Sequence, residues 1–146
     1  MNGFGVATQP VTVTDTAMML VSAPGHPMVD AELRYTTQQP FCVQLSLSLD
    51  DSPAVEWVFA RDLVIQGVRL PAGHGDIQLY PVDGGVIIEL HSPDGDAHLL
   101  ANSIDLTTFA DTIEKAVPLG RESEFYSLDA ELASLLAMSW RRPETA

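Results

Sequence analysis

The sequence predicts an α+β domain in which a twisted antiparallel β-sheet carries C-terminal helices packed on one face. Before residue 102, apolar and polar residues alternate in several short segments, as in strands that bury one face. After residue 102 the apolar residues follow helical spacing, and turn-forming residues separate the segments. Strands followed by helices are the element order of an α+β fold.

The size and composition of the chain predict one domain. Its 146 residues are 46% hydrophobic, which is enough for a single core. We expect a flexible N-terminal arm over residues 1–10, which show no apolar periodicity. The domain should then cover residues 11–140, and residues 141–146 should form a short tail.

The first half of the chain contains three predicted strands. The first covers Val11–Val21 and ends in a turn rich in Pro and Gly. The second covers Phe41–Leu49, in which every second residue is apolar. The third covers Val55–Ala60 and places Trp57 and Phe59 on one face, where we expect both aromatic rings in the core.

A short helix and three more strands should follow. The predicted helix runs from Arg61 to Gln66, and Gly67 ends it. The three strands cover Asp76–Tyr80, Val86–Leu90 and Ala97–Ala101, separated by two segments typical of hairpin turns.

Two helices are predicted at the end of the chain. In the first, an apolar stripe is formed by Leu106, Phe109, Ala110, Ile113 and Val117. Ser103 or Asp105 should cap its start, and Pro118 and Gly120 should end it. The second should begin near Ser127 with a stripe of leucines extended by Trp140; the leucines are Leu128, Leu132, Leu135 and Leu136.

The charge of the chain argues against nucleic acid as a partner. Twenty acidic residues against seven basic ones give a net charge of -13, which repels a phosphate backbone. The start of the chain lacks the pattern of a signal peptide. No apolar stretch approaches the roughly 20 residues that cross a bilayer. We therefore expect a cytoplasmic protein with no direct membrane insertion.

The residue types that carry chemistry do not form a recognisable site in the sequence. Cys42 is the only cysteine and lies in a regular predicted strand, away from groups that would lower its pKa. His74 stands between two glycines, as in a flexible turn. His91 and His98 flank a hairpin and could face each other, but cysteine ligands are absent and only carboxylates could complete a zinc site there. We expect no catalytic residue, cofactor or metal.

Five short motifs along the chain are more specific than its composition. The most characteristic is Glu-Trp-Val-Phe-Ala-Arg-Asp-Leu over residues 56–63. The other four are Glu-Leu-Arg-Tyr over 32–35, Gly-His-Gly-Asp over 73–76, Ser-Pro-Asp-Gly over 92–95 and Val-Pro-Leu-Gly over 117–120. In this order and spacing the motifs resemble the SsgA-like family of sporulation and cell-division proteins of actinobacteria. The resemblance covers about residues 11–138, and the pattern is most similar to the SsgB type.

The resemblance implies a fold similar to the whirly proteins and a role without catalysis. Members of the family are thought to help place the tubulin-like protein FtsZ at future septa, and to interact with one another. The resemblance therefore implies FtsZ and other divisome or SsgA-like proteins as partners, recruitment to the division septum and a homo-oligomer, by family resemblance a trimer.

Candidate interface residues follow from exposure and residue type. Arg34, Arg61 and Asp62 are expected at the surface or at subunit contacts, since Arg is favoured at interfaces. Leu136 and Trp140 are expected on the last helix, with Trp140 as an exposed anchor. The alternative function is a single-stranded nucleic-acid binder of whirly-like fold. That activity requires a basic groove with stacking aromatic residues.

Overall fold

The computed structural model describes residues 12–50 and 52–125, which contain an eight-stranded sheet. The strand order is β4-β3-β2-β1-β8-β7-β6-β5, and every neighbouring pair is antiparallel. The strands are β1 (Thr12–Leu20), β2 (Met28–Tyr35), β3 (Cys42–Ser48), β4 (Val55–Ala60), β5 (Ala72–His74), β6 (Ile77–Val82), β7 (Gly85–Ser92) and β8 (Gly95–Ala101).

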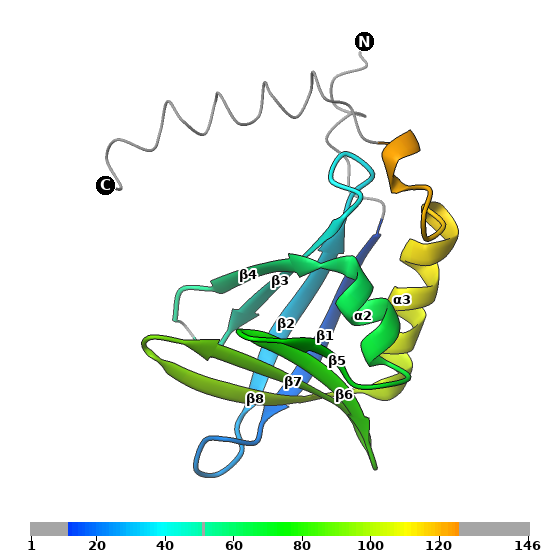
Figure 1. Ribbon diagram of the computed structural model, residues 1–146. Coiled ribbons are helices and arrows are strands. Elements are labelled where there is room, and N and C mark those ends of the chain that lie inside the picture. Colours follow the sequence, from blue (N-terminus) through cyan, green and yellow to red (C-terminus); the bar gives the residue numbers. More distant parts are fainter. Residues whose placement is uncertain (1–11, 51, 126–146) are drawn as a thin grey trace.

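The sheet curls into a half-barrel made of two four-stranded halves (Figure 1). The halves join through β1 and β8, whose ladder contains only the pairs Met19–Leu100 and Leu20–Leu99. Each half follows the chain as hairpins, so its register is set locally by the turns. The predicted antiparallel sheet is confirmed.

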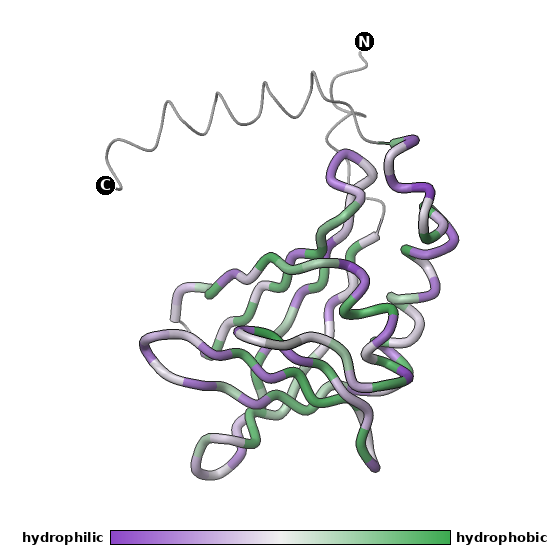
Figure 2. The backbone as a smooth tube through the Cα atoms, viewed as in Figure 1, coloured by the Kyte–Doolittle hydropathy of each residue, from purple (hydrophilic) through white to green (hydrophobic). Residues whose placement is uncertain are grey.

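Two helices pack on the concave face of the sheet and fill one end of the half-barrel (Figure 1). They are α2 (Arg61–Gly67) and α3 (Ser103–Ala116), and the chain then makes the 3₁₀ turn η1 (Glu122–Glu124). Apolar residues alternate with polar ones along the strands (Figure 2), and the buried ones form one core with the helices. The core includes Leu33, Leu45, Leu79, Ile88, Leu106, Phe109 and Ile113.

The start of α3 corrects the predicted cap. Asn102 is the N-cap, and its side-chain oxygen accepts a hydrogen bond from the Asp105 backbone N–H at 2.9 Å. The predicted caps, Ser103 and Asp105, both lie inside the helix. An Asn side chain can satisfy a free N–H of the first turn from outside the helix, which makes it as good a cap as Ser or Asp.

Two strands were missed by the sequence analysis. In β2, buried residues from Val29 to Tyr35 alternate with polar ones, but the buried set includes the small Ala31. Strand β5 occupies the segment in which a flexible turn at His74 was expected, and pairs with β6. The turn lies one residue later, at Gly75, whose φ of +76° favours glycine.

A buried ion pair links the start of α2 to the 3₁₀ turn η1 and overturns one expectation. Arg61 was expected at the surface, but only 1% of it is exposed. Its guanidinium donates to Glu122 Oε2 from Nη2 at 2.8 Å and from Nε at 3.2 Å, and to the Ile113 carbonyl at 3.3 Å. A guanidinium can be buried only when its charge is neutralised and its N–H groups are satisfied.

Neighbouring groups complete this buried site. The Arg61 guanidinium lies 5.8 Å from the centre of the Tyr35 ring, a cation–π contact. The Tyr35 hydroxyl donates to the Pro40 carbonyl at 2.8 Å, and burial raises the pKa of this phenol. Glu122 Oε1 accepts from the Gly120 backbone N–H at 2.9 Å. The hydrogen bond from Arg61 lowers the pKa of the Glu122 carboxyl.

Replacing Glu122 by Gln should destabilise the fold, because it leaves the Arg61 charge buried without a counter-charge. We expect a loss of about 3 kcal/mol in the free energy of unfolding, measured by urea denaturation. Glu124→Gln is the matched control, because Glu124 pairs with Arg121 on the surface and should change stability little. Equal losses in both variants would contradict the buried role of Glu122.

The same pair should make stability depend on acid pH. The pKa of Glu122 is lowered in the folded state from its ordinary value of 4.5, so its contribution is complete above that value. It should be lost as the pH falls through the folded pKa, because protonated Glu122 no longer neutralises Arg61. The stability difference between wild type and Glu122→Gln should therefore shrink below pH 4.5. A difference that is constant down to the acid transition would contradict this.

Candidate protein-interaction surface

The end of the half-barrel opposite the helices is open and forms an apolar groove of about 370 Å³. The loop between β3 and β4 borders it on one side and the β7–β8 hairpin on the other. Its volume lies within the range of about 300–1,000 Å³ that is typical of ligand pockets. The apolar residues that line it are Leu20, Val29, Leu47, Leu49, Pro53, Val55, Trp57, Leu90, Ala97 and Leu99.

The rim of the groove combines exposed apolar side chains with carboxylates. Val55 is 57% exposed at the start of β4, and Leu49 is also exposed. Asp94 and Asp96 border the groove at the tip of the β7–β8 hairpin. The Asp96 carboxylate lies 3.0 Å from His91 on the convex face, so Asp94 is the acidic group left for the groove. Such a site can take apolar side chains on its floor and attract a basic group at its edge.

The convex face of β1, β2 and β3 carries a second, acidic depression. It is lined by Asp15, Asp30 and Glu32, with Ser46 and Ser48 beside them. Asp15 lies directly opposite Glu32 in the register of β1 and β2, an arrangement that is unfavourable for two like charges. This face lacks the basic groove that a single-stranded nucleic-acid binder requires.

Three of the five predicted interface residues lie within the described fold, and they do not share one surface. Arg34 lies on the convex face of β2 and pairs with Glu32 at 2.8 Å. Asp62 is exposed in the first turn of α2, whereas the neighbouring Arg61 is buried. Leu136 and Trp140 lie outside the described residues, as does the helix predicted to begin near Ser127.

The groove was not found from the sequence because its residues come from six strands. Trp57 and Leu90 were each assigned to a strand, but only the curl of the sheet places both beside one cavity. Alternation along a strand indicates which face is buried. It does not indicate how far the core fills the space between distant strands.

No helix within the described residues is long and apolar enough to cross a membrane.

Comparison with known proteins identifies the family. The model of the family described as Streptomyces sporulation and cell division protein SsgA matches residues 29–122. The chain belongs to this family. The SsgB protein of Streptomyces coelicolor, named a sporulation-specific cell division protein, is 39% identical over 125 residues, which cover 83% of this chain and 91% of that protein. SsgB of Frankia casuarinae is 39% identical over 135 residues, covering 89% and 92% of the two chains.

Solved structures of SsgA-like proteins share the half-barrel. The SsgA-like sporulation-specific cell division protein from Thermobifida fusca aligns with a TM-score of 0.75 and 28% identity, covering 92% of this chain and 98% of the other. A structure reported with SsgB mutations that correlate to longitudinal cell division in sporulating Streptomyces coelicolor aligns with a TM-score of 0.69 and 35% identity. It covers 78% of this chain and 95% of the other. The predicted fold and family are therefore confirmed.

Proposed function

We propose that this SsgA-like protein is a non-catalytic regulator that helps to position the division machinery, above all FtsZ, at septation sites during sporulation. The family match over residues 29–122 carries the proposal, because relatives that match most of the chain are named sporulation-specific cell division proteins. The protein would act in the cytoplasm and be recruited to the septum. It would bind FtsZ and other SsgA-like or divisome proteins, and itself as a homo-oligomer, a trimer by family resemblance.

The groove at the open end of the half-barrel supports a role in binding proteins. Its floor is apolar and its rim carries Asp94, so it suits a partner segment with apolar side chains next to a basic residue. The net charge of -13 would speed association with a basic segment and disfavour acidic competitors. Four further residues remain proposed contacts, either with the same partner proteins or with a second copy of this chain. They are Arg34, Asp62, Leu136 and Trp140.

Substitution at the groove should separate binding from folding. Val55 and Val58 are both 57% exposed on β4. Val55 lines the groove, whereas Val58 pairs with Gln44, which lies on the opposite face. Val55→Glu should reduce capture of purified FtsZ at least tenfold, because it adds a charge to the apolar rim. Val58→Glu should capture FtsZ as the wild type does, with the same melting temperature as Val55→Glu.

Equal capture by the two variants would remove the groove from the proposal. A third variant, Leu136→Ala with Trp140→Ala, tests the C-terminal contact. If the double variant loses capture of FtsZ and Val55→Glu captures it as the wild type does, the docking surface lies at the end of the chain and not at the groove.

The location of the protein in sporulating cells tests the function itself. A fluorescent fusion that replaces the native protein should form foci or ladders at septation sites, because a positioning factor must be present where the septum forms. Time-lapse microscopy alongside labelled FtsZ provides the measurement. Diffuse fluorescence throughout sporulation would contradict the proposed function, whatever the groove binds.

A further inference from the structure

A cluster of imidazole and carboxylate groups lies on the convex face of the β7–β8 hairpin. Glu89 and His91 are two residues apart on β7, and His98 lies directly opposite Glu89 on β8. Asp96 lies opposite His91 in the same ladder. The cluster faces away from the groove, because the buried residues Leu90 and Leu99 point to the other side of the sheet.

Three side-chain atoms converge in this cluster. Glu89 Oε1 lies 3.2 Å from His91 Nε2 and 4.0 Å from His98 Nε2. One atom from each of the three residues lies within 4.8 Å of the other two. Four-coordinate zinc holds ligands at about 2.0–2.1 Å, which places neighbouring donor atoms about 3.3 Å apart. The cluster is therefore within about 1.5 Å of that arrangement, and its three side chains are each partly exposed to the solvent.

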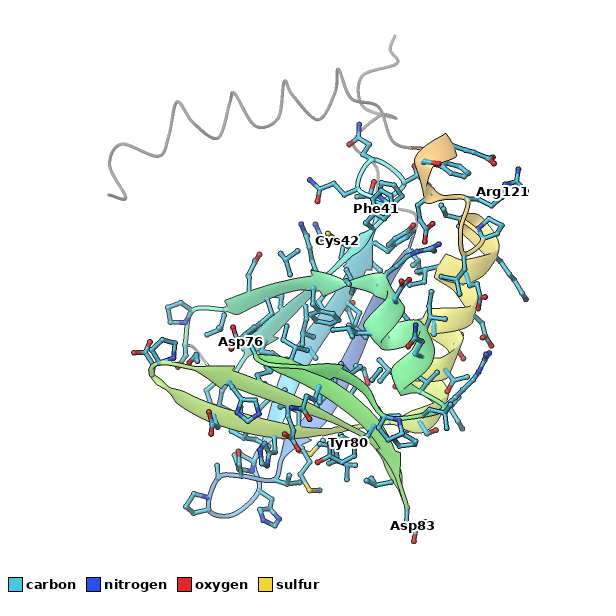
Figure 3. The ribbon with its side chains drawn as sticks, viewed as in Figure 1. Phe41, Cys42, Asp76, Tyr80, Asp83 and Arg121 are labelled. Carbon is cyan, nitrogen blue, oxygen red and sulfur yellow. The ribbon has the colours of Figure 1, made fainter. Side chains whose placement is uncertain are left out.

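Further hydrogen bonds fix which atoms are left to bind a ligand. Asp96 Oδ1 lies 3.0 Å from His91 Nδ1, so Asp96 can accept a hydrogen bond from Nδ1–H and leave the lone pair of Nε2 for a metal ion. The Tyr80 hydroxyl donates to Glu89 Oε2, which leaves Oε1 toward the histidines. Tyr80, labelled in Figure 3, comes from the neighbouring strand β6. A carboxylate behind a ligating histidine is the usual outer partner in zinc sites.

We propose that Glu89, His91 and His98 bind one divalent transition-metal ion of the zinc class. Two imidazoles and one carboxylate suit Zn²⁺ and its neighbours, whereas Mg²⁺ and Ca²⁺ select oxygen ligands. Three protein ligands leave at least one position for water or for a group from a partner. Asp96 and Tyr80 are positioning residues that orient His91 and Glu89.

The ion would link β7 to β8 across the hairpin that borders the groove. The rings of His91 and His98 lie edge to face with centres 6.1 Å apart. An ion bound by both would connect β7 and β8 in addition to the backbone hydrogen bonds between the two strands. No metal was expected from the sequence, because only carboxylates could complete a site with the two histidines and none was placed beside them. The signal was a pair of alternations, Glu89 with His91 and Asp96 with His98, on the two arms of one hairpin.

Titration of the untagged full-length protein with ZnCl₂ by calorimetry, after treatment with a chelator, tests the site. Wild type should bind one Zn²⁺ with a micromolar or lower Kd and melt at a higher temperature with the ion. His91→Ala and His98→Ala should each weaken binding at least tenfold, and Asp96→Asn about tenfold. Co²⁺ bound to the wild type should give the visible absorption of a tetrahedral site.

His26→Asn is the matched control, because it removes an exposed imidazole from the turn between β1 and β2 that is not one of the clustered ligand groups. It should bind Zn²⁺ as the wild type does. All variants are compared by circular dichroism, and His91→Gln replaces His91→Ala if the latter does not fold. Absence of stoichiometric binding by the wild type, or equal affinity in the cluster variants and His26→Asn, would overturn the proposal. Either negative result would leave the proposals for the groove and for septation standing, because both rest on other observations.

Discussion

The ion pair between Arg61 and Glu122 is the constraint on which the closed end of this fold depends. Arg61 begins α2, and Glu122 begins the 3₁₀ turn that follows α3. Their contact therefore joins segments 61 residues apart in the chain. The Ile113 carbonyl and the Tyr35 ring add the end of α3 and strand β2 to the same site. A buried pair contributes little net stability compared with apolar residues of similar size, so its main effect is to fix the relative positions of these elements.

This arrangement explains why the molecule has one filled end and one open end. Both helices and the ion pair occupy the same end of the curled sheet, while β1 and β8 share only two residue pairs at the joint. At the other end, nothing within the described residues covers Val55 and Leu49, which remain exposed. A protein that acts through its surface can keep such a groove because the core at the filled end holds the strands in place.

The sequence predicted the parts of the fold that depend on local pattern. Strand β3 and helix α3 were assigned correctly because each has a regular apolar period and clear boundaries. Strand β2 was missed because the small Ala31 weakens its period, although four of its residues are buried. Arg61 was misplaced because its partner is 61 residues away, and no local pattern reports such a pairing. The groove was missed for the same reason, since it depends on strands that meet only in three dimensions.

The two faces of the β7–β8 hairpin show how one short segment can serve two surfaces. Side chains alternate along a strand, so Leu90, Ala97 and Leu99 line the groove while Glu89, His91 and His98 gather on the convex side. The same backbone carries both sets, and any restraint on the outer set also limits movement of the inner set. A cation bound to the outer cluster would therefore limit how much the width of the groove varies before a partner binds. A site that needs less ordering loses less free energy when a partner binds. The outer face can therefore change the affinity of the groove for a partner without contacting that partner.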